Sequence, residues 1–326
     1  MRILRKHFGL LILMLIFIIS ILSGCHSNAS GEKIERVGML IEHTIHDQNW
    51  GSKGYKGLLE IQEDLKMDIF FREGVQTQQE VNIAVEEFAN QGVQVIIGHS
   101  SNFGEYFDKI RTSYPNIQFI YVNGGYSADN LISLNFNSLA MGFFAGMVAA
   151  EMTDTDHIGV IAAHEWQPEV EGFYEGANYQ NSDVAIDIKY VHNWDEKDVA
   201  MDYYKELTED EADVIYPAGD AFSVPIVERA MNDGHYSIGY VNDQQSIGGS
   251  SVLTSTIQHI DKLYLHALKE LQKGDLTGGI YNFGFVEEVI SLGPYSEHLS
   301  ESFIDELEQL IEQYKETELL PHQMKK

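Results

Sequence analysis

The chain has 326 residues with a formal net charge of −29, and 44% of its residues are hydrophobic. This length and apolar content predict a large buried core, organised as two domains of ordinary size. A chain this acidic repels phosphate backbones, and its sequence contains no basic face or recognition helix, so we expect no binding to nucleic acid.

The N-terminal segment has the pattern of a secretory signal. Three basic residues precede an apolar run over residues 8–22, which is short for a transmembrane span. Small residues then stand directly before Cys25, the only cysteine of the chain, as in the lipobox of bacterial lipoproteins. We predict a lipoprotein signal peptide over residues 1–24, lipidation of Cys25 and a polar tether over residues 25–35. The protein would then be lipid-anchored to the cell membrane on its extracytoplasmic face, although an uncleaved signal anchor is the alternative.

The first half of the chain alternates apolar, strand-like runs with amphipathic helical ones. Strands are predicted at residues 36–41, 67–71, 93–97, 117–122 and 131–136. Helices are predicted at residues 52–65, 77–91 and 103–113, the second of them starting with the capping box Thr77–Glu80 and closing at Gly92. This βαβ repetition is typical of a parallel sheet covered by helices.

A helix rich in glycine and alanine over residues 141–152 separates the two halves, and the alternation then restarts. Strands are predicted at residues 157–162, 184–191, 214–216, 237–241 and 252–256. Helices are predicted at residues 169–179, 197–208 and 224–233, with one more ending at Lys273 and a last amphipathic helix around residues 303–314.

The repetition predicts an α/β fold of two doubly wound lobes joined by a hinge. The first lobe would comprise residues 36–138 together with part of residues 257–290. The second would comprise residues 139–256 together with part of residues 287–318. In sheets of this kind, ligands bind beyond the carboxyl ends of the strands, so the loops that follow the strands carry the specificity.

These loops supply the candidate binding residues, which are aromatic or polar. They are Asp47, Asn49, Trp50, His99, Ser100, Phe103, Trp166, Phe173, Gly219, Asp220 and Asp243. Aromatic rings with a few polar groups suit a flat, polar, uncharged small molecule held by stacking and hydrogen bonds. The alternative is that Trp50 and Trp166 only pack the interface between the lobes.

Catalytic and metal-binding interpretations have weaker support. His43 and His46 lie three residues apart beside Asp47, but a third ligand would have to be assumed, so we expect no metal site. The segment Gly98–Asn102 is similar to a nucleophile elbow, yet Asn102 replaces the closing glycine and no oxyanion motif accompanies it. We therefore expect a binding protein without enzymatic activity and without a cofactor.

Four segments resemble the basic membrane lipoprotein family, whose members are two-lobed substrate-binding lipoproteins of ABC transporters, several of them specific for purine nucleosides. The segments are Asp47–Gly57, Met141–Ala150, Asn242–Gln244 and Val252–Thr256. The resemblance covers nearly the whole chain after the tether and implies a periplasmic-binding-protein type I fold.

Within this family the chain is most similar to the Med-type members, which are described as positive regulators of competence gene expression. This similarity rests on Trp166–Val170, Tyr216–Asp220 and Gly239–Gln244. It implies two roles: a receptor that delivers a small, nucleoside-like ligand to an ABC permease, or a regulatory lipoprotein that acts indirectly through a membrane signalling partner without binding DNA.

The chain departs from the nucleoside-binding pattern at three positions. Gly51 stands where the family has an asparagine, Val241 where it has an aspartate expected to hold a ribose hydroxyl, and Gln258 where it has a lysine. Each missing hydrogen bond to a buried polar group of the ligand weakens binding by about 1 to 3 kcal/mol. We therefore expect ordinary purine nucleosides to bind weakly or not at all.

Overall fold

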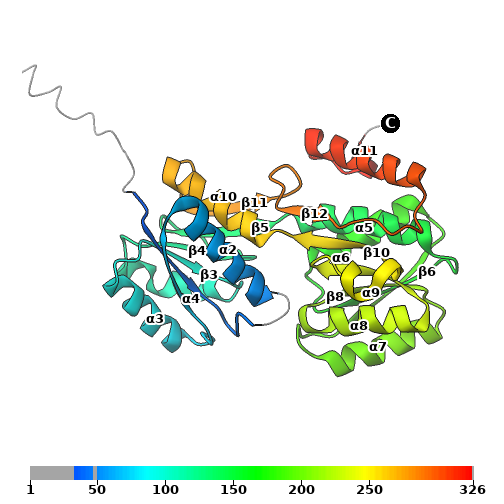
Figure 1. Ribbon diagram of the computed structural model, residues 1–326, viewed down its shortest axis with the longest axis horizontal. Coiled ribbons are helices and arrows are strands. Elements are labelled where there is room, and N and C mark those ends of the chain that lie inside the picture. The colour runs from blue at the N-terminus through cyan, green and yellow to red at the C-terminus, as the bar shows by residue number, and fades with distance from the viewer. Residues whose placement is uncertain (1–32, 47–49, 325–326) are drawn as a thin grey trace, which may run out of the picture. The chain divides into compact units, whose positions relative to one another are not determined.

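Two six-stranded sheets build two α/β lobes (Figure 1). The computed structural model describes residues 33–46 and 50–324. In the first sheet the strand order is β11-β5-β4-β3-β1-β2, and every neighbouring pair is parallel. In the second the order is β12-β10-β9-β8-β6-β7, and β12 is antiparallel to β10. The expected fold class, two doubly wound lobes, is confirmed.

The strands agree closely with the apolar runs of the sequence. Those of the first sheet are β1 (Arg36–Leu40), β2 (Asp68–Arg72), β3 (Val95–Gly98), β4 (Gln118–Val122), β5 (Leu131–Phe136) and β11 (Gly279–Phe283). Those of the second are β6 (His157–Ala162), β7 (Ala185–Tyr190), β8 (Val214–Ala218), β9 (Tyr236–Val241), β10 (Val252–Gln258) and β12 (Ile290–Leu292).

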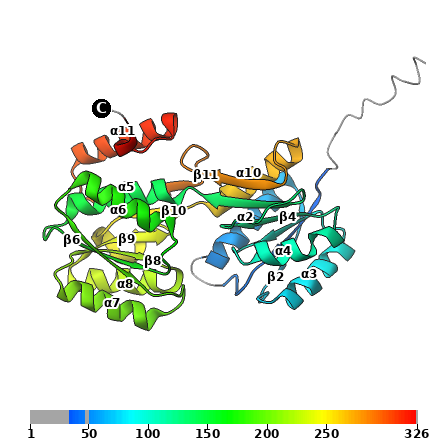
Figure 2. The same ribbon diagram turned by 180° about the vertical axis from the view of Figure 1, so that it is seen from behind.

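Helices cover both faces of the first sheet (Figure 2). One face packs against α2 (Trp50–Leu65) and α10 (Ile260–Lys273), and the other against α3 (Gln78–Asn90) and α4 (Phe103–Ile110). The predicted capping box starts α3: the Thr77 side chain accepts from the Glu80 amide, and the Glu80 carboxylate accepts from the Thr77 amide. A single turn, η1 (Arg111–Ser113), extends α4.

Helices also cover both faces of the second sheet. One face packs against α5 (Ser138–Met152) and α6 (Pro168–Gln180), and the other against α7 (Lys197–Glu209) and α8 (Asp220–Asp233). The remaining elements are α9 (Gln245–Gly248), η2 (Gly249–Ser251), α11 (Glu301–Thr317) and η3 (Pro321–Gln323).

Glycines allow α5 and α6 to pack with their backbones in contact. A Cβ atom added at Gly142 or Gly146 of α5 would lie 2.0 or 2.1 Å from a carbonyl oxygen of α6, and one at Gly176 of α6 would lie 1.8 Å from the Phe143 carbonyl oxygen. The glycines and alanines that the sequence places on α5 thus serve its close packing against α6. This packing also fixes the start of α6, which lines the cavity described below.

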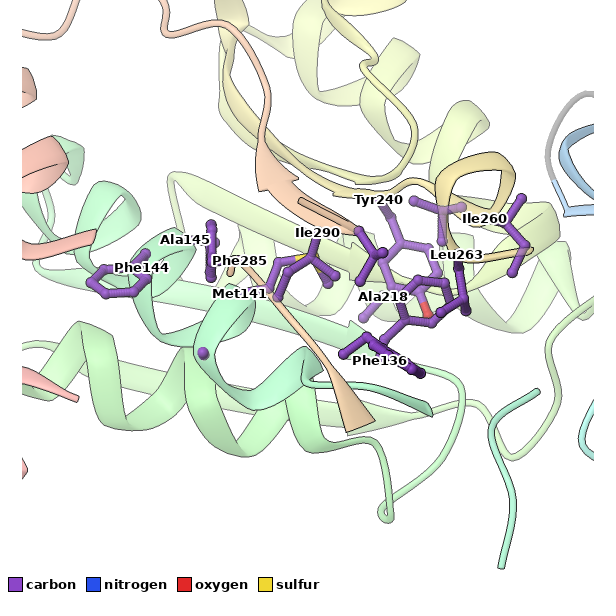
Figure 3. Packing of buried hydrophobic residues seen from close by; sticks show 14 of the residues in the cluster. Phe136, Met141, Phe144, Ala145, Ala218, Tyr240, Ile260, Leu263, Phe285 and Ile290 are labelled. Atoms are coloured by element: carbon purple, nitrogen blue, oxygen red, sulfur yellow. The ribbon is translucent and has the colours of Figure 1, made fainter. Parts of the chain in front are cut away.

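The chain passes between the lobes in three places: from β5 to α5, from β10 to α10, and from β11 to β12. A buried apolar cluster runs through this region and includes Phe136 of β5, Tyr240 of β9, Leu263 of α10 and Ile290 of β12 (Figure 3). The hydrophobic core is thus continuous through the connections instead of ending at each lobe.

The structure adds detail that the sequence pattern did not predict. Strands β11 and β12 occupy a segment that was expected only to cross back between the lobes, and each extends a different sheet. Helix α8 begins at Asp220 and not at the predicted residue 224. Pro225 lies inside the helix, where it removes one backbone hydrogen bond, and does not mark the start of the helix. Within the described ranges, no helix has both the length and the apolar character needed to cross a membrane.

Candidate binding site between the lobes

A cavity of about 460 Å³ lies at the carboxyl ends of the strands of both sheets. From the first lobe and its connection to α5, the lining residues are Glu42, His43, Trp50, Ser100, Ser101, Asn102, Asn123, Gly124, Asn135, Phe136, Asn282 and Ser138. From the second lobe they are Trp166, Gln167, Pro168, Glu169, Trp194, Asp195, Asp220, Tyr240, Val241 and Gln258. A cavity of this size accommodates a metabolite-sized ligand.

All three tryptophans of the chain line this cavity. Trp50, the first residue of α2, stacks on the His99 ring with the ring centroids 4.6 Å apart and an interplanar angle of 11°. Trp166 stacks in the same manner on His164, at 5.1 Å and 11°. Trp194 stands nearly perpendicular to Trp166, with the centroids 5.8 Å apart. Each lobe therefore presents an indole ring that is backed by a histidine.

Hydrogen bonds hold the Trp50–His99 pair in place. The Trp50 Nε1 donates to the His99 carbonyl oxygen at 3.2 Å, and the His99 Nε2 lies 2.7 Å from the Trp50 carbonyl oxygen. Because a carbonyl can only accept, Nε2 carries the proton, and Nδ1 then accepts from the Tyr264 hydroxyl at 2.5 Å. Burial raises the pKa of Tyr264 well above its usual value, so that hydroxyl remains a donor.

Four of the lining side chains are carboxylates: Glu42, Glu169, Asp195 and Asp220. Among the described residues, no lysine or arginine lines the cavity. Glu169 is the most deeply placed, with only 4% of its surface exposed. Its Oε1 accepts from Gln167 Nε2 at 2.9 Å and from the Tyr240 hydroxyl at 3.0 Å. The cavity therefore combines aromatic surface with negative charge.

Lys53 connects the two lobes beside the cavity. It lies on α2 of the first lobe, and its Nζ donates to the carbonyl oxygens of Val241 at 2.6 Å and Gln258 at 2.7 Å, at the ends of β9 and β10. Burial lowers the pKa of Lys53 to about 8, although the charge of Asp261 opposes the shift. A cation held by two carbonyl dipoles in this position fixes how α2 meets the second sheet.

Val241 has a strained backbone at the edge of the cavity. Its φ is +64°, a left-handed conformation that is rare for a β-branched residue. The Asn242 amide donates back to the Tyr240 carbonyl oxygen at 2.7 Å, which closes a tight turn around Val241. Strain of this kind costs on the order of 1 to 3 kcal/mol and is concentrated at functional sites in proteins.

The cavity brings together four of the residues that the sequence suggested: Trp50, Ser100, Trp166 and Asp220. Asp47, Asn49 and Cys25 lie outside the described residues.

The other suggested residues that the structure describes do not line the cavity. His99 lies beneath Trp50, and Phe103 is fully buried against Phe107. Phe173 is fully buried and stacks on Tyr216. Gly219 precedes the first residue of α8, where a Cβ atom would meet the Phe222 ring, and Asp243 accepts a hydrogen bond from the Gln245 amide.

The sequence pattern did not predict several of the lining residues, above all Glu169, Trp194 and Tyr240. Trp194 follows β7, so its place after a strand was a signal that could have found it. Glu169 was assigned to a helix instead of to a loop, and Tyr240 to the body of a strand. Among the described residues, no group of three or more His, Cys, Asp or Glu side chains could hold a metal ion.

The family follows from comparison with known proteins. The model of the ABC transporter substrate-binding protein PnrA-like family matches residues 34–323. The chain belongs to this family. The expected resemblance to basic membrane lipoproteins is confirmed, since basic membrane protein A of Borreliella burgdorferi is 25% identical over 86% of each chain.

The expected similarity to the Med-type members is confirmed as well. The transcriptional activator protein med of Bacillus subtilis is 41% identical, over 95% of this chain and 98% of its own length. A crystal structure described as a transcriptional activator of the comK gene from Bacillus halodurans is also 41% identical, covers 88% of this chain and all of the other, and has a TM-score of 0.83.

A more distant solved structure supports the fold. A solute-binding protein of an ABC transporter system from Aeropyrum pernix is 20% identical, with a TM-score of 0.69, over 89% of this chain and 82% of its own. At this identity the likeness shows only the shared fold, which is of the periplasmic-binding-protein type I kind expected from the sequence.

Proposed function

We propose that this protein is a lipid-anchored, extracytoplasmic binding protein that takes a small polar ligand into the cavity between its lobes. The observation that carries the proposal is the cavity itself, to which each lobe contributes an indole ring stacked on a histidine. A flat ring, nucleoside-like in shape, fits between such surfaces, and polar groups such as Asn102, Asn123 and Gln258 would orient it. The membership of the PnrA-like family supports delivery of that ligand to an ABC permease.

The lipid anchor is part of the same proposal. The residues from Arg2 to Cys25 have the order of charge, apolar run and small residues that precedes an acylated cysteine. An acylated Cys25 would leave the binding lobes outside the cytoplasm, where a receptor meets its ligand before the permease does.

The tryptophans make binding directly measurable. Since all three line the cavity, a ligand that enters it changes their fluorescence. The full chain in detergent micelles is titrated with nucleosides, sugars, amino acids and amines, and positives are checked by the rise in thermal stability that a ligand specific for the folded state produces.

The Trp166→Ala variant should weaken binding of a positive ligand about tenfold or more, because stacking of a ring contributes about 1 to 3 kcal/mol. Tyr174→Ala provides a matched control, since Tyr174 is an exposed aromatic residue of the same lobe that does not line the cavity. A ligand whose affinity is the same in both variants binds elsewhere, and that result would refute the proposed site.

A regulatory role is the second candidate, favoured by the 41% identity to a protein named as a transcriptional activator. With a net charge of −29, the chain would act through a membrane partner and not on DNA itself. Removal of the gene separates the two roles: lower uptake of the ligand indicates transport, whereas lower transcription of competence genes with unchanged uptake indicates regulation.

A further inference from the structure

The charged side chains that line the cavity are carboxylates, and the nearby Lys53 directs its ammonium group to the Val241 and Gln258 carbonyl oxygens. Four carboxylates line the cavity, while no lysine or arginine among the described residues does. Carboxylates attract cations and disfavour phosphate or carboxylate ligands, and walls of low dielectric strengthen this selection. Acidic residues commonly gather on open protein surfaces without binding a ligand. The contacts of the most buried carboxylate, Glu169, are therefore decisive.

Glu169 is the most buried of these carboxylates. Only 4% of its surface is exposed, and it lines the cavity. Its two hydrogen bonds both reach Oε1, whereas no hydrogen bond or basic partner of Oε2 is found among the described residues. The first turn of α6 offsets part of the charge because it carries the positive end of the helix dipole. Oε2 is not sealed from solvent but opens into the cavity, where a positive group of a ligand would reach it.

The indole rings supply a second, independent indication. Trp166 and Trp194 meet at an interplanar angle of 68°, so the two rings form a corner, and Trp166 is 62% exposed despite its size. The faces of indole rings attract cations through their negative quadrupole, and rings set at a corner are the usual receptor for quaternary ammonium groups. Asp195 directly follows Trp194 and brings a carboxylate to this corner.

From the half-used Glu169 carboxylate and the tryptophan corner, we infer that the ligand is an organic cation whose positive charge is spread over an alkylated nitrogen or a flat nitrogen heterocycle. The inference rests on the proposed binding function and specifies the class of ligand. Such cations are weakly hydrated, so they lose little when they leave water, and their rings or methyl groups fit the aromatic surfaces. A metal ion would require a cluster of ligands that the described residues do not provide.

A matched pair of isomers tests the charge without changing size. 1-Methyladenosine is a cation at pH 7, whereas its isomer N6-methyladenosine is neutral. The full chain in detergent micelles is titrated with both, and with choline, by tryptophan fluorescence and calorimetry. We expect 1-methyladenosine or choline to bind at least about tenfold more tightly than N6-methyladenosine, a difference of about 1.4 kcal/mol, and to bind more weakly as salt is added.

Variants identify the groups responsible. Glu169→Gln keeps the size and both hydrogen-bonding positions of the side chain but removes the charge, and it should reduce 1-methyladenosine affinity about tenfold more than it changes N6-methyladenosine affinity. Glu171→Gln is the matched control, because Glu171 lies in the same first turn of α6, is exposed and does not line the cavity. If Glu169→Gln folds poorly, Asp195→Asn provides a second test. Asp195 lies in an exposed loop beside the corner formed by Trp166 and Trp194, and the loss of its charge should also weaken cation binding.

Two results would overturn the inference. One is that neither cation changes the tryptophan fluorescence at millimolar concentration. The other is that N6-methyladenosine binds as tightly as its isomer and that neither Glu169→Gln nor Asp195→Asn alters cation affinity. In either case the proposed binding function still stands if the protein binds a neutral ligand and Trp166→Ala abolishes that binding. The binding function itself is refuted if Trp166→Ala leaves the affinity for every ligand unchanged.

Discussion

Trp50 lies flat on His99, with the ring centroids 4.6 Å apart, and the two residues exchange hydrogen bonds through the indole Nε1 and the imidazole Nε2. The histidine follows β3, and the tryptophan begins α2, so the pair joins a strand end to a helix start. Trp166 and His164 repeat the stacking in the second lobe. The indole rings that line the cavity are thus held by the strand ends beneath them.

The contact between α2 and His99 requires a glycine, which gives the first prediction. A Cβ atom at Gly54 would lie 2.5 Å from the His99 ring, so Gly54→Ala should displace the histidine and the indole above it. We expect a loss of about 1 to 3 kcal/mol in the free energy of unfolding, together with altered Trp50 fluorescence. Denaturant unfolding measures the first quantity.

Gly125→Ala is the control for this prediction. Nothing lies within 4 Å of the added Cβ at Gly125, and its backbone is not left-handed. If Gly54→Ala is as stable as Gly125→Ala, then the histidine does not depend on the close approach of α2.

The second prediction concerns pH and Lys53. Burial lowers the pKa of Lys53 to about 8, so between pH 8 and about 10 the unfolded chain keeps a proton that the folded chain releases. Stability contributed by this group therefore rises with pH through that window, by at most about 1.4 kcal/mol per pH unit. Below pH 8 both states are protonated, and the cost of burying the charge is constant.

The measurement is the difference in the free energy of unfolding between the native chain and Lys53→Met, which should shift in favour of the native chain from pH 8 to pH 10. Lys56→Met is the control because the hydrogen bond that Lys56 donates to the Asp261 carboxylate raises the pKa of Lys56, so the stability that Lys56 contributes is lost only above the ordinary lysine range. A pH-independent difference for Lys53→Met would show that Lys53 remains charged in the folded protein throughout.

The third prediction concerns nucleosides. Val241 and Gln258 line the cavity. The resemblance to nucleoside-binding members of the family implies an aspartate and a lysine at these two positions. Val241→Asp with Gln258→Lys should therefore strengthen binding of adenosine or guanosine, about tenfold or more for the hydrogen bonds regained. Aspartate also tolerates the left-handed backbone at residue 241 better than valine does.

Calorimetry on the native chain and the double variant tests this. The native chain should bind both nucleosides weakly. Tight binding by the native chain that is lost in Trp50→Ala would contradict the prediction and indicate an ordinary nucleoside receptor.

The fourth prediction concerns the anchor. Cys25→Ala removes the only thiol of the chain, so it should abolish incorporation of labelled fatty acid and release the protein from the membrane or leave it with its signal uncleaved. Cys25→Ser serves as a conservative second variant that also lacks a thiol. Unchanged lipid labelling in either variant would remove the lipoprotein assignment.

The sequence alone determined the fold class and most elements. Strand β5 (Leu131–Phe136) and strand β6 (His157–Ala162) lie where the apolar runs placed them, and the Thr77–Glu80 capping box starts its helix as predicted. These features are local: periodicity, capping and strand length depend on neighbours in the chain. The same reasoning placed Trp50, Ser100, Trp166 and Asp220 after strands, and all four line the cavity.

Only the tertiary structure decided what surrounds these residues. Glu169 and Tyr240 meet at 3.0 Å although 71 residues separate them, and Lys53 reaches Val241 across 188 residues. The periodicity of the sequence predicts neither contact, because both depend on how the two sheets and their helices meet. The residues of each loop, considered one loop at a time, favoured an uncharged ligand. The folded chain instead gathers carboxylates and indole rings into one cavity, and from this arrangement we infer a cationic ligand.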